Sequence, residues 1–326
     1  MNTQLTAPES TVSTARPRTQ RGPRPAAGNA LLRARRRALL PFAGPAILLY
    51  IAFVFGPTLY SVWISFHETS GYGDSKWVGV RNYTRLLSDD SYRKALFNTL
   101  ELLVIGGGCT FVLSFALTMV LREMRGRLLA RNVLFFPNIV NAMVFGVLAG
   151  FLFNPDGLVN TLLHNLFGVT DPPKWLSAEN TFPMILATII WTATGYYTTI
   201  IMAGVDQIPA YFYEECALSG ANAWQRLRYV TIPLTWEVLT VCALLWTISS
   251  VKIFELVLVF GGNNSGLPPT NTWPVSMYSY AEAFGGLGSV PRYGMASASA
   301  LTSLLLVALI VVVLRRAMDR RDSVQY

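Results

Sequence analysis

The sequence predicts an all-α, polytopic membrane protein with six transmembrane helices. Three observations lead to this class: the composition, six long apolar stretches, and basic residues that gather on alternate connecting segments. Hydrophobic residues make up 52% of the 326 residues and charged residues only 13%, whereas a water-soluble domain carries about 25% charged residues. Much of the surface is therefore expected to face lipid.

The first three stretches meet the requirement for crossing a bilayer, which is roughly 20 mostly apolar residues in a helix. The first, 38–65, contains prolines, which membrane helices tolerate when neighbours re-satisfy the freed carbonyls. The second, 96–121, includes Glu101 near its start, and the third, 132–153, carries no charge. Each is predicted to be one membrane-spanning helix.

The last three stretches follow the same rule. The fourth is 182–204. The fifth, 235–259, is one of the two weakest, together with the second, because three charged residues fall within it. The sixth, 293–314, has no charge from Ala296 to Leu314. Within the fifth, Lys252 and Glu255 are three residues apart, a spacing that allows an ion pair on one helix face.

The distribution of lysine and arginine sets the orientation. Of the 26 basic residues, 18 lie in the segments 1–37, 122–131, 205–234 and 315–326, seven lie in the loops 66–95, 154–181 and 260–292, and Lys252 lies within the fifth stretch. Basic residues stay on the cytoplasmic side, so both termini are predicted to lie in the cytoplasm. Positive charge at the membrane edge meets anionic lipid, and the net charge of +8 therefore does not indicate a nucleic-acid partner.

This topology divides the chain into three regions. Residues 1–37 are rich in arginine and lack an apolar period, and are predicted to be a disordered cytoplasmic tail. Residues 38–316 form the six-span membrane domain, and 317–326 form a short cytoplasmic tail.

Several kinds of chemistry are missing from the sequence. A phosphate-binding loop needs a lysine after a glycine turn, and none of the four lysines follows a glycine. His67 and His164 fall in predicted outer loops, and the three cysteines form no CxxC pair. We therefore predict no catalytic residue, no metal site and no cofactor. The acidic residues lie near span ends, which disfavours a self-sufficient secondary carrier, because such carriers place acids at mid-membrane.

The cytoplasmic segment 206–233 is long for a plain connector. Pro209 suits the first turn of a helix, Glu214 and Glu215 suit its N-terminal half, and Gly220 can end it. A second short helix is expected over 222–229. This helix–turn–helix exposes aromatic residues, and it could dock in a groove of a partner protein or lie on the membrane surface; the residues alone do not decide between these.

The same segment resembles the EAA loop of ABC-importer permeases, in residue types and in spacing. Glu215 and Cys216 stand where that family has two alanines, and Ser219 stands where it usually has aspartate. The residues that match the family pattern are Tyr213, Glu214, Gly220, Ala221 and Pro233.

Further resemblance extends over most of 38–316, to carbohydrate permeases of the maltose and glycerol-phosphate type. One departure is that Gly261-Gly262 is followed by two asparagines, where the family often has proline. The matching segments, in the family's order, are 57–66, 77–83, 97–100 and 252–255.

The resemblance implies that 206–233, hereafter the coupling loop, enters an ATPase subunit. It implies that Glu214 is the charged contact with the ATPase subunit and that Gly220 is the pivot of the loop. Tyr213, Glu215 and Ala221 beside them are implied to take part in the same coupling. The implied partners are a second permease subunit in a heterodimer, two ATP-binding subunits, an extracellular solute-binding lipoprotein and membrane lipid. The implied function is half of a pore for a sugar or sugar-like solute in a bacterial cell membrane. A polyol, a glycerol-phosphate and, from another class, a secondary carrier remain as alternatives, and nothing in the sequence favours a membrane enzyme or scaffold.

Polar and aromatic residues within the spans are candidates for the solute path. Amides suit sugar hydroxyls, and aromatic faces suit the C–H face of a sugar ring. The alternative is that these residues serve helix packing or anchor at an interface. The candidates are Asn138, Asn141, Trp191, Thr194, Tyr197, Trp246, Ser250 and Phe254, with Tyr196 and Ser249 beside them.

Overall fold

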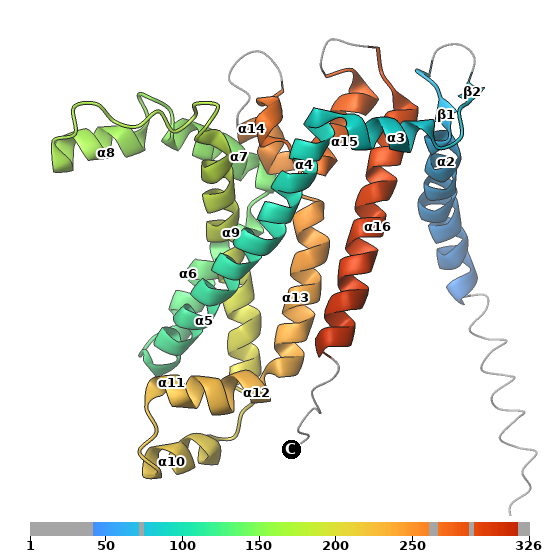
Figure 1. Ribbon diagram of the computed structural model, residues 1–326. Coiled ribbons are helices and arrows are strands. Elements are labelled where there is room, and N and C mark those ends of the chain that lie inside the picture. The colour runs from blue at the N-terminus through green and yellow to red at the C-terminus, as the bar shows by residue number, and fades with distance from the viewer. Residues whose placement is uncertain (1–41, 72–74, 261–266, 287–289, 319–326) are drawn as a thin grey trace, which may run out of the picture. The chain divides into compact units, whose positions relative to one another are not determined.

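The computed structural model describes residues 42–71, 75–260, 267–286 and 290–318 (Figure 1). The predicted tail 1–37 and most of the predicted tail 317–326 lie outside these residues. The chain divides into two units at Thr58, and each is described by itself. The result is a mostly helical membrane protein, as predicted.

The described part of the first unit, 42–58, is helical. It belongs to an apolar helix that runs from Phe42 to Ser65. A π-helical turn, η1 (Ile51–Phe55), precedes α2 (Gly56–Ser65). Pro57 has no N–H to donate to the preceding turn, and a π turn accommodates such a missing bond. The Thr58 hydroxyl donates to the Val54 carbonyl at 2.7 Å.

After the end of α2, the second unit contains a feature absent from the all-α prediction. Strands β1 (His67–Glu68) and β2 (Lys76–Trp77) pair antiparallel, and α3 (Arg81–Ser88) follows. Arg85 and Arg81 contact the Glu68 carboxylate at 2.8 and 2.5 Å. The hydrogen bond from Arg85, with the charge of Arg81, lowers the pKa of Glu68 below its ordinary value.

The second span is longer than predicted. It runs as α4 (Asp90–Glu101), a π turn η2 (Leu102–Gly106) and α5 (Gly107–Glu123). It starts six residues before the predicted 96, because the Asp89 side chain accepts hydrogen bonds from the N–H groups of Ser91 and Tyr92 and caps the helix. Hydropathy misses this start because the first turns are polar.

The predicted third span, 132–153, is not one helix. It consists of α6 (Arg127–Ile139) and α7 (Ala142–Leu152), bent by 95° at the break. Pro137 removes one backbone donor near the end of α6. The Asn141 side chain accepts from the Met143 N–H at 2.8 Å and so starts a new helix.

The predicted fifth span, 235–259, is also broken. Helix α13 (Trp236–Val251) ends before α14 (Glu255–Phe260). The fourth and sixth spans are each one continuous helix, α9 (Thr181–Val205) and α16 (Tyr293–Met318). Four helices of the described chain are long and apolar enough to cross a membrane. There are up to six spans if two bent helix pairs each count as one: α6 with α7, and the helical segment Ala223–Leu234 with α13.

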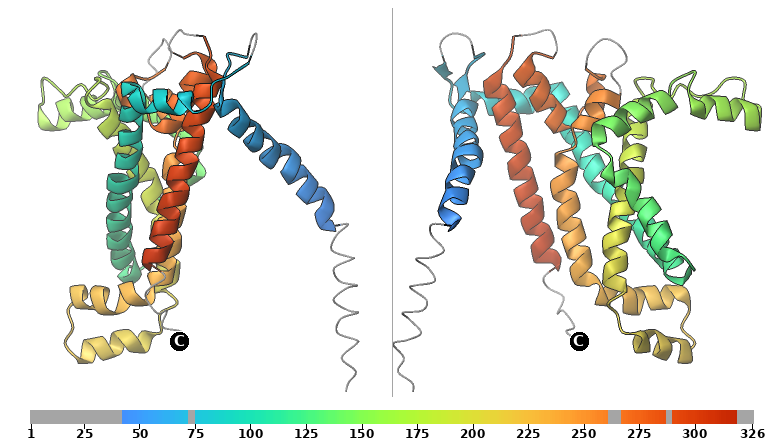
Figure 2. Two further views of the ribbon diagram at one scale, coloured as in Figure 1. Left: turned by 45° about the vertical axis from the view of Figure 1, so that its right-hand side comes forward. Right: turned by 180° about the vertical axis from the view of Figure 1, so that it is seen from behind.

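The connecting helices gather at the two ends of the second unit (Figures 1 and 2). At one end lie α8 (Leu158–Phe167), η4 (Thr270–Thr272) and α15 (Val275–Phe284). At the other lie α10 (Ala210–Leu218), α11 (Ala223–Arg226), the π turn η3 (Leu227–Thr231) and α12 (Ile232–Leu234). Helix α9 lies at the centre and packs against α5, α6 and α13.

Candidate functional site

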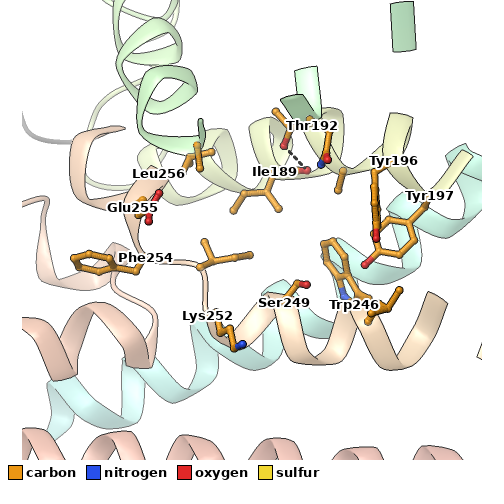
Figure 3. A pocket seen from close by; sticks show the side chains of 15 residues that line it. Ile189, Thr192, Tyr196, Tyr197, Trp246, Ser249, Lys252, Phe254, Glu255 and Leu256 are labelled. Carbon is orange, nitrogen blue, oxygen red and sulfur yellow. Dashed lines mark hydrogen bonds between the residues drawn. The ribbon is translucent and has the colours of Figure 1, made fainter. Parts of the chain in front are cut away.

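A pocket of about 590 Å³ lies between α9 and α13, beside both helix breaks (Figure 3). Asn138 and Ala142 border it from the α6–α7 break, and Lys252 to Leu256 border it from the α13–α14 break. Non-helical backbone at membrane depth is tolerated only where protein buries it or a cavity lies beside it. The non-helical backbone of the two breaks is therefore accommodated because it borders this pocket.

Aromatic rings form one wall of the pocket. Tyr197 and Trp246 are 3% and 4% exposed, with ring centroids 5.9 Å apart and ring planes at 71°. Tyr196 meets Tyr197 edge-on at 5.1 Å. Edge-to-face contacts stabilise a particular orientation of the two rings, beyond the energy gained by burying them. The rings of this wall are therefore held in fixed orientations.

Trp246 is held from behind by the second span. Its indole N–H donates to the Leu103 carbonyl at 2.9 Å, within the π turn η2. A Cβ on Gly107 would lie 2.5 Å from the indole nitrogen, and one on Gly106 would lie 3.1 Å from the ring. The two glycines are what allow the ring to approach this backbone.

The charged residues at the pocket do not form the predicted pair. Helix α13 ends at Val251 and α14 begins at Glu255, so Lys252 and Glu255 do not share a helix face. Both are exposed, and among the described residues no ion pair joins them. Figure 3 shows the two side chains at separate parts of the pocket.

The predicted path residues divide into two groups. Four of the eight line this pocket: Asn138, Tyr197, Trp246 and Phe254. The two additional candidates, Tyr196 and Ser249, line it as well. Lining residues that sequence reasoning missed are mainly apolar or small, such as Ile189, Thr192 and Ile253. The sequence signals for this location were Pro137 followed by a capping asparagine, and Lys252 within the fifth stretch.

The other four candidates lie away from this pocket. Asn141 caps α7, and Trp191 packs edge-on against Phe145 in a separate apolar pocket. The hydroxyls of Thr194 and Ser250 donate to the carbonyls of Ile190 and Thr247 in their own helices.

The coupling loop forms the predicted helix–turn–helix. Helix α10 begins at Ala210, so Pro209 is its capping residue and not in its first turn. Gly220 turns the chain with φ +73°. Asn222 and Gln225 exchange side-chain-to-backbone hydrogen bonds and start α11 as a capping box. The second helix continues through η3 and α12 beyond the predicted 229 and meets α13 at a 75° bend.

Tyr213 fixes α10 to the membrane domain. The Arg122 guanidinium lies 3.8 Å from its ring centroid, and its hydroxyl lies 3.1 Å from that of Thr231. Glu214 and Glu215 are exposed, as is Leu218 at 90%. The loop thus has an inner contact at Tyr213 and an outer surface that combines two carboxylates with apolar side chains.

Known proteins resemble this chain over most of its length. Trehalose/maltose transport system permease protein MalF of Thermococcus litoralis is 28% identical over 283 residues, covering 85% of this chain and 92% of the relative. Osmoprotective compounds uptake permease protein GgtC of Synechocystis is 30% identical over 235 residues, covering 69% of this chain and 82% of the relative.

A solved structure has the same fold. It is a bacterial ABC transporter involved in the import of the acidic polysaccharide alginate, with a TM-score of 0.75, 20% identity and coverage of 90% of this chain and 99% of that one. Residues 110–323 match the family described as "Binding-protein-dependent transport system inner membrane component". The chain belongs to this family, and is a multi-pass inner-membrane permease subunit of an ABC importer that works with a binding protein and ATPase subunits.

Proposed function

We propose that this permease forms half of the translocation pore for a sugar or sugar-like solute. The observation that carries the proposal is the aromatic pocket between α9 and α13. The half-buried ring of Tyr196, backed by the buried Tyr197, suits the C–H face of a pyranose, and the exposed Asn138 amide and Ser249 hydroxyl suit its hydroxyl groups. Binding sites commonly combine apolar walls with a few placed polar groups in this way.

The relatives support a carbohydrate. Their names specify trehalose and maltose, α-glucosides and lactose. A relative for osmoprotective compounds keeps a polyol or another compatible solute as the second candidate. Lys252 and Glu255 are both exposed at the pocket. Because their charges are opposite, the pocket has no net charge from this pair, which fits a polar, uncharged solute.

The proposed mechanism is alternating access driven by ATP. Both termini lie in the cytoplasm, six spans cross the membrane, and a second permease subunit completes the pore as a heterodimer. Two ATP-binding subunits receive the coupling loops, and an extracellular lipoprotein delivers the solute. The exposed carboxylates of Glu214 and Glu215 contact the ATPase groove, while Gly220 and Ala221 set the angle at which α10 enters it.

Side-specific labelling tests this topology. After replacement of the native cysteines by serine, Asp171→Cys is expected to react with a membrane-impermeant maleimide on intact spheroplasts. Gln225→Cys is expected to react only after permeabilisation. Both residues are exposed, so access to the reagent depends on the side of the membrane and not on burial. The reverse pattern would overturn the cytoplasmic position of the coupling loop.

Uptake of labelled sugars tests the substrate and the pocket together. Cells lacking the gene are expected to lose uptake of a disaccharide such as trehalose or maltose. Asn138→Ala is expected to lower the maximal uptake rate by about fivefold, since a lost hydrogen bond costs about 1 kcal/mol. Asn132→Ala is the matched control, because Asn132 is exposed on the same helix α6 and lies outside the pocket.

Two results would contradict the proposal. If the deletion left the uptake of every sugar and polyol unchanged, the solute class would be wrong. If Asn138→Ala and Asn132→Ala transported the solute at equal rates, the pocket would not lie on its path.

A further inference from the structure

Helix α8 has no counterpart in the transport mechanism described so far. It connects α7 to the returning segment 168–180 and lies crosswise to α9, at the end of the unit opposite the coupling loop (Figures 1 and 2). A helix that lies flat at the level where the spans end occupies the place of the membrane–water boundary. The distribution of apolar and polar side chains around α8 indicates which face of the helix contacts lipid.

The side chains of α8 separate into two arcs. With about 100° between successive residues, every apolar residue falls on one half of the helix and every polar residue on the other. Leu166 and Phe167 are 70% and 75% exposed. The apolar arc consists of Leu158, Val159, Leu162, Leu163, Leu166 and Phe167, and the polar arc of Asn160, Thr161, His164 and Asn165.

One residue of the polar arc is held by the protein. Asn160 is 5% exposed, accepts a hydrogen bond from the Trp175 indole at 2.7 Å, and donates to the Pro155 carbonyl at 3.0 Å. Trp175 belongs to the returning segment, which in Figure 1 passes above α8, away from the bundle. Asn160 thus ties one edge of the polar arc to that segment, while Thr161, His164 and Asn165 are exposed. Most of the apolar arc lies on the other side of the helix.

The surroundings indicate lipid and not a protein as the occupant. No lysine, arginine, aspartate or glutamate occurs from 157 to 170, so the helix offers no charge for a complementary partner. The apolar arc continues the exposed apolar surface of α7, where Phe151 is 71% exposed. In a multi-pass membrane protein, an uncharged amphipathic helix in this position has the character of an interfacial helix.

We propose that α8 lies in the headgroup–acyl boundary of the leaflet opposite the coupling loop, with its apolar arc buried in lipid. The identity of that leaflet rests on the proposed topology, but the lipid contact does not. Since the polar arc carries no lysine or arginine, binding depends on apolar area alone. The helix would fix the depth of the α7–α9 connection.

Fluorescence quenching in vesicles tests the lipid contact. In the full-length chain, purified with its bound subunits and with native cysteines replaced, the NBD fluorophore is attached to Leu162→Cys on the apolar arc or to Asn165→Cys on the polar arc. Both positions are exposed. In phosphatidylcholine vesicles, a lipid with a spin label at a shallow acyl carbon is expected to quench the first probe about threefold more than the second. Aqueous iodide is expected to quench in the opposite order.

Three further outcomes decide the matter. Replacing part of the phosphatidylcholine by phosphatidylglycerol at pH 8 should leave both signals unchanged, and a marked increase in lipid quenching would overturn the purely apolar contact. Equal iodide quenching at both positions would overturn the proposal, because the apolar arc would then face water. Shielding of Leu162→Cys from both quenchers would overturn it in favour of a covering protein. Spin-labelled lipid in both leaflets keeps this test independent of the topology experiment.

Discussion

Replacing Gly220 with valine is expected to abolish solute uptake while leaving the protein in the membrane. Gly220 has φ +73°, a left-handed conformation that costs a β-branched residue about 1–2 kcal/mol. A Cβ at this position would meet nothing within 4 Å, so the effect comes from backbone strain and not from a clash. Relief of that strain changes the angle between α10 and α11, and α10 then no longer fits the ATPase groove.

The measurements are uptake in cells and co-purification of the ATPase. Gly168→Val is the matched control, since Gly168 also follows a helix with positive φ (+66°) and open space around its Cβ, but lies outside the coupling loop. Gly220→Asn is expected to retain much of the activity, because asparagine tolerates this conformation. If Gly220→Val transported normally with its ATPase bound, the loop would be a passive surface helix.

Replacing Gly195 with alanine is expected to prevent normal packing of the membrane domain. The added Cβ would lie 1.7 Å from the Leu134 carbonyl oxygen and 2.5 Å from its carbon. These are backbone atoms of α6, so no rotamer change relieves the clash and α6 must move away from α9. Overpacking of this kind costs about 3 kcal/mol or more when the backbone has to shift.

The readout is the temperature at which half of the protein remains monodisperse in detergent. Gly195→Ala is expected to lower this temperature strongly and to reduce the amount of protein in the membrane. Gly108→Ala is the matched control, because Gly108 lies within α5 and a Cβ there would meet nothing within 4 Å. Similar stability of the two variants would show that α6 and α9 pack less closely than described.

The existence of the apolar helices could be predicted because hydropathy depends on local composition alone. Their continuity could not, because an apolar window gives the same value whether or not the helix is broken within it. The break after α6 had a local signal in Pro137 and Asn141, and the break at 252–254 had only an internal lysine. The start of α4 depended on capping by Asp89, which a search for apolar residues ignores.

The coupling loop was more predictable than the pocket. Its turn depends on Gly220 and its second helix on the Asn222–Gln225 capping box, and both are interactions within a few residues. The pocket depends on which side of each helix faces its neighbours. Hydroxyl side chains such as those of Thr194 and Ser250 bond to their own helices, so a polar residue within a span does not by itself indicate a path.

The hydrogen bond from Trp246 to Leu103 makes the pocket wall a mechanical link to the second span. A π turn such as η2 contains one residue more than an α-helical turn, and that excess is worth about 100° of rotation along the helix axis. The surplus residue of η2 therefore lies at the point where the pocket wall is hydrogen-bonded to the second span, and a larger residue at Gly106 or Gly107 would separate the two.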